Sequence, residues 1–313
     1  MKIGFFGDGL WADGTLSLLA SSGVQVAFIV PRYQTSTEAC PLRAWAEKLS
    51  ADYLCIKDVN HIDSLCLLKK YNVDLMVSMS FDQILKDSII DMAPLGFINC
   101  HAGALPFYRG RNPLNWALIN GETSFGITVH YIDSGIDTGD ILIQEFYEIS
   151  LGDHYKDLLA LAIDECPKLL FKTISSLQKG KVTRVRQDSI HSQGFYCGRR
   201  REGDENIDWS STAIQLHNFI RAISLPGPGA RCQHENGRQL TVLESSLVPE
   251  SLSYIGTNGE VVGRTDTGVI VKVADTVLVL NKVAWIDLNR VDSNTIGTVF
   301  VPQFPIGTRL LKI

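Results

Sequence analysis

Three polar side chains stand out because their types and spacing could support a group transfer. Asn99 and His101 lie two residues apart at the end of the apolar run 96–101, so in an extended strand they face the same side. Asp137 follows in an acidic loop that also contains glycine. An amide can stabilise an oxyanion, an imidazole can remove a proton near neutral pH, and a carboxylate can orient that imidazole. These residues form our candidate catalytic group, although a single buried histidine is more often a satisfied core residue.

The segments around these residues suit a binding site. The loop 102–112 carries Arg109 and Arg111, and two predicted strands flank the loop that contains Asp137. Polar residues at the carboxyl end of a buried parallel strand are costly unless they are used, and ligands bind at that edge of an open α/β sheet. We therefore expect the three side chains to point into one crevice.

The elements that must position these residues can be predicted from hydrophobic periodicity. Short apolar runs predict five strands, at 2–6, 24–30, 53–56, 73–79 and 96–100. Helical patterns separate them, which is typical of a mostly parallel α/β sheet with crossover helices. Helical spacing also predicts a helix over 153–177, with a kink or a break at Pro167.

A polar stretch at 189–207 predicts a surface linker and a second domain beyond it. An amphipathic helix is predicted at 212–223. Strands follow at 239–244, 260–263, 269–273 and 276–283, with a tight turn at Ala274-Asp275. We therefore expect a catalytic domain over residues 1–204 and a smaller C-terminal domain over 205–313, made of one helix and a small antiparallel β-barrel.

The segment 7–12 matches the G-x-G-x-x-G/A dinucleotide fingerprint directly after the first predicted strand. The acidic residue that should end the second strand is missing, because that strand ends in Pro31-Arg32-Tyr33. A tight turn that needs small residues is the favoured interpretation. An NADP-dependent oxidoreductase with Arg32 on the 2′-phosphate stays open as a distant alternative.

Three motifs together resemble the 10-formyltetrahydrofolate-dependent formyltransferase family. They are Asn-x-His at 99–101, Leu-Pro-x-Tyr-Arg-Gly-Arg-x-Pro-Leu-Asn-Trp at 105–116 and Ile-Asp-x-Gly-Ile-Asp-Thr-Gly-Asp at 132–140. The resemblance continues through 195–200, 207–209 and 217–230. The family includes methionyl-tRNA formyltransferase, glycinamide ribonucleotide formyltransferase and the sugar N-formyltransferases of surface-polysaccharide pathways such as O-antigen synthesis.

The resemblance implies a Rossmann-like domain with helices on both faces of its sheet, and a catalytic triad that falls on Asn99, His101 and Asp137. Asn99 would stabilise the oxyanion of a tetrahedral intermediate, and His101 would act as the general base. Asp137 would orient and stabilise the imidazole, or hold a water that carries protons. One departure is Gly103-Ala104-Leu105-Pro106, where many relatives have Ser-Leu-Leu-Pro.

The resemblance also implies a pocket for 10-formyltetrahydrofolate, and no metal. The residues expected to hold this co-substrate lie in two segments: Met79, Ser80, Phe81, Gln83, Ile84 and Leu85, then Asp133 and Ile136. The alternative is that 81–90 is simply a helix packed on the sheet.

The acceptor is predicted from charge. Residues 205–313 have nine Lys and Arg against ten Asp and Glu, and the whole chain has a net charge of −5. A tRNA platform would need a basic surface, so we expect no nucleic-acid partner. Residues 113–116, His130 and 197–200 are more similar to sugar-nucleotide formyltransferases. We therefore predict transfer of the formyl group to the amine of a UDP- or dTDP-activated amino-deoxy sugar.

A sugar nucleotide needs a few cations for its diphosphate and aromatic faces for its base and sugar. The residues expected to supply these contacts are Trp11, Tyr108, Arg109, Arg111, Asn112, Tyr196 and Arg199. A solvated charge run is the alternative for 199–201. Methionyl-tRNA formyltransferase is the alternative activity, and a catalytically silent folate- or nucleotide-binding module is a further one.

The remaining expectations concern compartment and assembly. The seven cysteines are odd in number and contain no Cys-x-x-Cys, which argues against a disulfide framework and a zinc site. Neither a signal peptide nor an apolar stretch of about 18 residues is visible. The sequence thus predicts a cytoplasmic protein without a membrane partner, and a homodimer is compatible with it.

Overall fold

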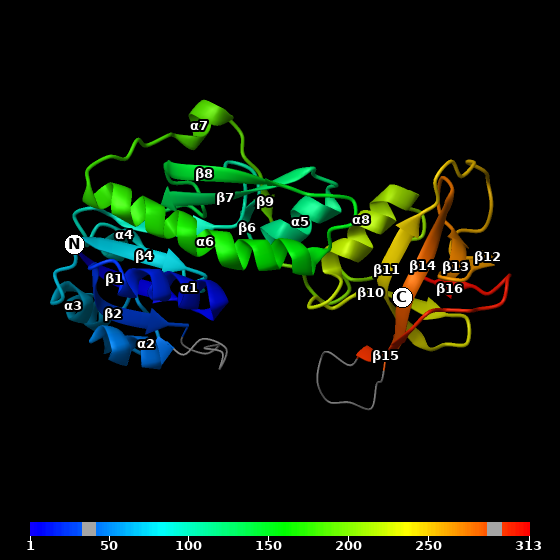
Figure 1. Ribbon diagram of the computed structural model, residues 1–313, viewed down its shortest axis with the longest axis horizontal. Coiled ribbons are helices and arrows are strands. Elements are labelled where there is room, and N and C mark those ends of the chain that lie inside the picture. The colour runs from blue at the N-terminus through cyan, green and yellow to red at the C-terminus, as the bar shows by residue number, and fades with distance from the viewer. Residues whose placement is uncertain (33–41, 287–295) are drawn as a thin grey trace. The chain divides into compact units, whose positions relative to one another are not determined.

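The computed structural model describes residues 1–32, 42–286 and 296–313, so Cys40 lies outside the described residues. The chain divides into two compact units (Figure 1). The first comprises residues 1–113, 124–148 and 160–198, and the second comprises 114–123, 149–159 and 199–313. A single boundary between residues 204 and 205 remains a prediction.

The first unit is built on a seven-stranded sheet with the order β3-β2-β1-β4-β5-β7-β8. Its parallel strands are β1 (Lys2–Gly7), β2 (Gln25–Pro31), β3 (Asp52–Tyr53), β4 (Leu75–Met79) and β5 (Phe97–His101). The edge is antiparallel and consists of β7 (Ser124–Tyr131) and β8 (Ile141–Glu148). The predicted α/β class with a mostly parallel sheet is confirmed.

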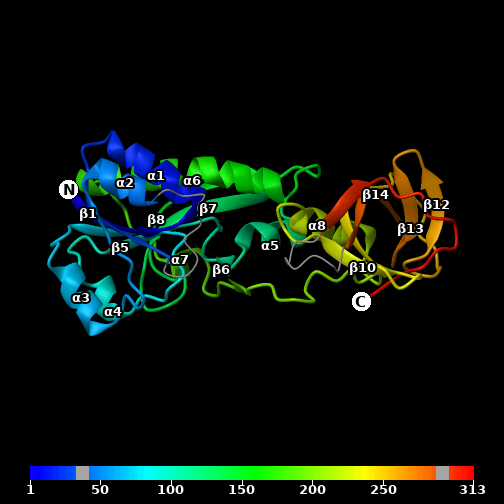
Figure 2. The same ribbon diagram turned by 90° about the horizontal axis from the view of Figure 1, so that it is seen from below.

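Helices cover both faces of this sheet (Figure 2). On one face lie α1 (Gly9–Ala20), α2 (Leu42–Leu49) and α6 (Tyr155–Gln178), and on the other lie α3 (Ile62–Lys69) and α4 (Asp87–Ile90). The core beneath α3 and α4 includes Phe6, Phe28 and Phe97, all at most 1% exposed. The rings of Phe6 and Phe28 meet edge to face at 5.7 Å.

The long helix predicted at 153–177 is present as α6, but the break predicted at Pro167 is absent. The helix runs unbroken past this proline. The proline ring packs against α1, where a Cβ atom on Gly14 would lie 2.9 Å from Pro167 Cγ. Proline has no N–H to donate at this position, so α6 continues with one helical hydrogen bond fewer.

The second unit contains α5 (Pro113–Ile119, from Leu114 on) and α8 (Ala213–Ile223), together with an antiparallel sheet. The order of this sheet is β12-β13-β14-β11-β10-β16, with β15 paired to β14. Its strands are β10 (Ala230–His234), β11 (Gln239–Leu247), β12 (Val261–Thr265), β13 (Gly268–Lys272), β14 (Val277–Ile286), β15 (Ile296–Phe300) and β16 (Leu310–Leu311). The predicted β-rich C-terminal region is confirmed.

A capping box at the start of α8 stabilises the helix that was predicted at 212–223. Thr212 and Gln215 form a capping box, in which each side chain accepts a hydrogen bond from the other residue's backbone N–H.

Among the described residues, no helix is both long enough and apolar enough to cross a membrane.

Candidate active site

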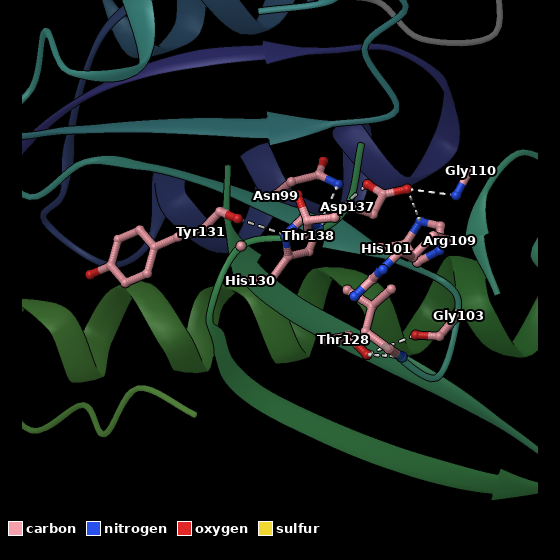
Figure 3. A network of polar contacts seen from close by, with 12 residues as sticks. Asn99, His101, Gly103, Arg109, Gly110, Thr128, His130, Tyr131, Asp137 and Thr138 are labelled. Carbon is pink, nitrogen blue, oxygen red and sulfur yellow. Dashed lines mark hydrogen bonds and ion pairs between the residues drawn. The ribbon is translucent and has the colours of Figure 1, made fainter. Parts of the chain in front are cut away.

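Asn99 and His101 lie at the carboxyl end of β5, where the sheet changes from parallel to antiparallel pairing. β5 pairs with β4 in parallel and with β7 antiparallel, which places Asn99 opposite His130 and His101 opposite Thr128. Figure 3 shows both side chains directed toward Asp137, which lies in the loop between β7 and β8. The three residues predicted for catalysis are therefore close together.

The carboxylate of Asp137 is the centre of this group. Its Oδ2 accepts a hydrogen bond from the backbone N–H of Gly110 at 2.8 Å and lies 3.7 Å from His101 Nδ1. Its Oδ1 lies 3.6 Å from His130 Nε2. Burial alone would raise the pKa of Asp137, but the positive charges of His101 and His130 in their protonated forms and the Gly110 N–H favour the carboxylate more strongly, so the pKa falls below its usual range.

The contacts of His101 fix which of its nitrogens can accept a proton. Nε2 lies 2.7 Å from the carbonyl oxygen of Tyr108, which can only accept, so Nε2 carries the hydrogen. Nδ1 is therefore the basic atom of the neutral ring, and it faces Asp137. Gly103 allows this arrangement, because a Cβ atom there would lie 2.5 Å from His101 Nε2. The departure from Ser-Leu-Leu-Pro thus falls directly against the imidazole.

The tautomer of His130 also follows from its contacts, and it determines which end of the Asn99 amide faces the ring. Its Nδ1 lies 2.7 Å from the carbonyl oxygen of Tyr131, so Nδ1 is a donor and Nε2 of the neutral ring is an acceptor. Asn99 Nδ2 lies 3.3 Å from that Nε2 and donates to it. The second N–H of Asn99 Nδ2 has no hydrogen-bond partner among the described residues.

The loop that follows His101 is anchored from β7 and β8. The buried hydroxyl of Thr128 donates to the Gly103 carbonyl at 2.7 Å. Gln144 donates from its Nε2 to the Leu105 carbonyl and to Thr128 Oγ1, both at 2.8 Å. These bonds hold the segment that presents the Tyr108 carbonyl to His101.

The loop 80–86 contains most of the residues predicted to hold the folate. It is not helical, since α4 begins only at Asp87, so the alternative of a packed helix is wrong for 81–86. Ser80 has a φ of 60° and is held by Arg32, which donates to its carbonyl at 2.7 Å and to its Oγ at 2.8 Å. Arg32, which the NADP alternative placed on a 2′-phosphate, therefore donates hydrogen bonds to this loop.

The other predicted folate contacts divide by exposure. Met79 and Leu85 are buried, and the ring of Phe81 packs on Phe6 at 5.5 Å. The Gln83 amide is bound on both sides by backbone groups, the Val59 N–H and the Ile56 carbonyl.

Three further predicted folate contacts lie in exposed positions. Ile84 and Ile136 expose apolar side chains. The Asp133 carboxylate accepts from Thr138 Oγ1 and from the Gly135 N–H of its own loop.

The glycine loop leads from β1 directly into α1 through Asp8 alone. Asp8 is 2% exposed, and its side chain caps the start of α1 by accepting from the Gly9 N–H. A Cβ atom on Gly7 would lie 2.6 Å from the Met79 carbonyl oxygen, so the close approach of β1 and β4 requires glycine.

Three of the residues predicted to bind the acceptor gather beside the triad. β6 (Arg109–Gly110) pairs in parallel with β9 (Tyr196–Cys197), which brings Arg109 over the ring of Tyr196 at 5.5 Å. The ring of Tyr108 lies 4.8 Å from that of Phe195.

Of the other predicted acceptor residues, Arg111 adjoins this cluster, because its backbone N–H donates to the Cys197 carbonyl at 3.0 Å. Arg111 and Asn112 are exposed in the loop after Gly110. Trp11 lies in the first turn of α1, and Arg199 is exposed in the second unit.

Left-handed backbone is concentrated in the site. Among the described residues, seven non-glycine residues have positive φ, and four of these belong to the predicted site: Ser80, Tyr108, Asn112 and Asp137. Such conformations cost free energy and persist where the surroundings hold them, which is common at functional sites.

Two polar residues of this site were missed in the prediction of site residues. His130 was noted only for its similarity to sugar-nucleotide enzymes, although its position on β7 places it opposite Asn99. Gln187 begins α7 (Gln187–Ile190), and its side chain bonds Arg109 and the loop of Asp137. The sequence carries no signal for it, because a four-residue helix in a polar stretch shows no periodicity.

Comparison with known families gives two matches. The family described as "Formyl transferase" matches residues 46–174, and "Formyl transferase, C-terminal domain" matches residues 200–296. The methionyl-tRNA formyltransferase of Syntrophus aciditrophicus is 31% identical over 93% of this chain and 94% of its own. That of Solibacter usitatus is 33% identical over 74% of this chain and 75% of its own.

Solved structures show the same fold in sugar-modifying enzymes. The sugar 3N-formyltransferase WlaRD, solved with dTDP and 5-N-formyl-THF, has a TM-score of 0.65 at 22% identity, covering 93% of this chain and 99% of its own. The N-formyltransferase from Helicobacter canadensis, with folinic acid and dTDP-3-aminofucose, has a TM-score of 0.66 at 22% identity over 90% and 99%.

No group of three or more His, Cys, Asp or Glu side chains in the described ranges is placed to hold a metal ion.

The family matches cover both parts of the chain, and the relatives above 30% identity align over most of it. The resemblance inferred from the sequence motifs is confirmed, and this chain belongs to the formyl transferase family.

Proposed function

We propose that this enzyme transfers the formyl group of 10-formyltetrahydrofolate to the free amine of a nucleotide-activated amino-deoxy sugar. The amine nitrogen bonds to the formyl carbon, and the bond from that carbon to the folate nitrogen then breaks. The products are an N-formyl sugar nucleotide and tetrahydrofolate. The proposal for the donor is supported by the folate compounds in the two related structures.

Each triad residue has a role that fits its contacts. The second N–H of Asn99 Nδ2 would donate to the oxyanion of the tetrahedral intermediate. His101 Nδ1 would remove the proton that the attacking amine must lose, and the charged Asp137 would stabilise the resulting imidazolium. Return of a proton to the folate nitrogen completes the transfer.

The observation that carries the choice of acceptor is the cluster of Arg109 with exposed aromatic rings beside the triad. Phe195 and Tyr196 are 41% and 56% exposed, so their rings are open to contact with a ligand. Tyr108 and Gly110, on either side of Arg109, bond His101 and Asp137 directly. An arginine that binds a diphosphate and rings that stack on a base would therefore hold an acceptor close to the catalytic groups.

Methionyl-tRNA is the second candidate acceptor, because the curated relatives above 30% identity carry that activity in their names. The two acceptors can be offered at equal concentration with the same folate donor while tetrahydrofolate release is followed. We expect turnover with a UDP- or dTDP-linked amino sugar and none with methionyl-tRNA. The reverse result would assign the alternative function, and no turnover with any acceptor would favour a silent binding module.

A further inference from the structure

Gln187 uses every hydrogen-bonding position of its amide although only 4% of the residue is exposed. Its Oε1 accepts from Arg109 Nε at 3.0 Å and from Arg109 Nη2 at 2.7 Å. Its Nε2 donates to the carbonyl oxygens of Asp137 and Gly139, both at 2.8 Å. A primary amide has two acceptor and two donor positions, so this side chain is fully satisfied. It is also the buried residue of an otherwise exposed α7.

These bonds join the two segments that position the Asp137 carboxylate. Asp137 has a left-handed backbone with a φ of 54°, which a non-glycine residue holds only when its surroundings impose it. Gln187 bonds the carbonyl of that residue, while the carboxylate accepts from the N–H of Gly110. Gly110 is the neighbour of Arg109, to which Gln187 is also bonded. The amide therefore fixes both the loop and the strand that supply these contacts.

We propose that Gln187 is a positioning residue for formyl transfer. It holds the 137–139 loop in the conformation in which Asp137 faces His101, and it couples that loop to the Arg109 side chain. The inference rests on the proposed catalytic role of Asp137 and holds for either acceptor. It assigns no direct contact with substrate to Gln187.

The Gln187→Glu variant separates the bonds that Gln187 accepts from Arg109 from the bonds that it donates to the 137–139 loop. Its carboxylate can still accept from Arg109, but it has no hydrogen to donate and would face the carbonyl oxygens of Asp137 and Gly139. The Gln187→Met variant has a side chain of similar length and removes both sets of bonds. Gln178→Glu is a matched control, because it makes the same charge change at an exposed position at the end of α6.

We expect Gln187→Glu to lower kcat by about 100-fold, the size of effect that a small misplacement of a catalytic group produces. The KM for the folate donor should change far less than kcat, because other residues hold the loop 80–86, and Gly135 and Thr138 hold the Asp133 carboxylate. Gln178→Glu should match the wild type. Asp137→Asn alone should also lower kcat, and adding Gln187→Glu to it should cause no further loss, since Gln187 acts through Asp137.

Other outcomes would overturn the proposal in distinct ways. Wild-type kcat in Gln187→Glu, or losses that multiply in the double variant, would show that Gln187 does not act through Asp137. Full activity of Asp137→Asn would instead contradict the proposed mechanism itself. If Gln187→Glu does not fold by circular dichroism, Gln187→Met is measured in the same cycle with the same expectation. Failure of both variants to fold would make Gln187 a folding residue and overturn the proposal.

Discussion

At the scale of single residues, the site depends on which hydrogens its side chains already use. The carbonyl of Tyr108 binds the Nε2 hydrogen of His101, and the carbonyl of Tyr131 binds the Nδ1 hydrogen of His130. The spacing of Asn99 and His101 in one strand was enough to predict that their side chains lie together. The choice of nitrogen was not predictable, because it depends on where the left-handed Tyr108 directs its carbonyl.

The first prediction concerns the triad. Asn99→Ala, His101→Ala and Asp137→Ala should each lower kcat by about two orders of magnitude or more, because each removes an oxyanion donor or a proton-transfer group. Steady-state kinetics with the folate donor checks this, and His154→Ala, at a half-buried histidine of the second unit, is the control. Near-normal turnover in two of the three triad variants would contradict the mechanism.

The second prediction follows from the lowered pKa of Asp137. A carboxyl group with a lower pKa in the folded state stabilises the fold above its unfolded pKa of about 3.9, and this contribution is lost as pH falls toward the folded pKa. The wild type should therefore have its full advantage in thermal midpoint over Asp137→Asn at about pH 5, and this gap should shrink below about pH 4. A gap that grows as the pH falls would show the opposite shift. The exposed Asp266→Asn is the control.

At the scale of elements, periodicity predicted the strands of the parallel sheet, α6, α8 and most strands of the second unit. The elements that it could not predict are the short ones that complete the site. β6 and β9 have two residues each, and α7 has four. Such elements are too short to show a period, and they form because distant segments bond them. Gln187 lies fifty residues from Asp137, and no local pattern encodes that contact.

The third prediction tests how β7 holds the loop after His101. Thr128→Val keeps the shape of the side chain but removes the hydroxyl that donates to Gly103 and accepts from Gln144. We expect a loss of about 1–3 kcal/mol in the free energy of unfolding, because buried partners stay unsatisfied. We also expect a lower kcat, because the Tyr108 carbonyl loses its support. Thr128→Ser retains the hydroxyl and should keep kcat near the wild-type value in the same denaturation and rate measurements.

At the scale of the whole molecule, the two candidate acceptors differ in the charge that the protein needs to bind them. The chain shares more sequence with methionyl-tRNA formyltransferases, while its fold matches solved sugar N-formyltransferases at 22% identity. The proposed catalytic residues would serve formyl transfer to either amine. Charge does separate the acceptors physically. Residues 205–313 have no excess of Lys and Arg, and the whole chain is acidic.

The last prediction uses this difference in charge. A tRNA bound through six to ten phosphates would lose about 10³–10⁵ in affinity between 50 and 200 mM salt, whereas a diphosphate held by one or two arginines should lose far less. We expect the KM for the sugar-nucleotide acceptor to rise only slightly over that range. Arg109→Met should raise this KM and reduce its dependence on salt, while Arg264→Met, at an exposed arginine of the second unit, should do neither. A steep dependence that survives Arg109→Met would mean that the acceptor is held by many phosphate contacts elsewhere, as a tRNA would be.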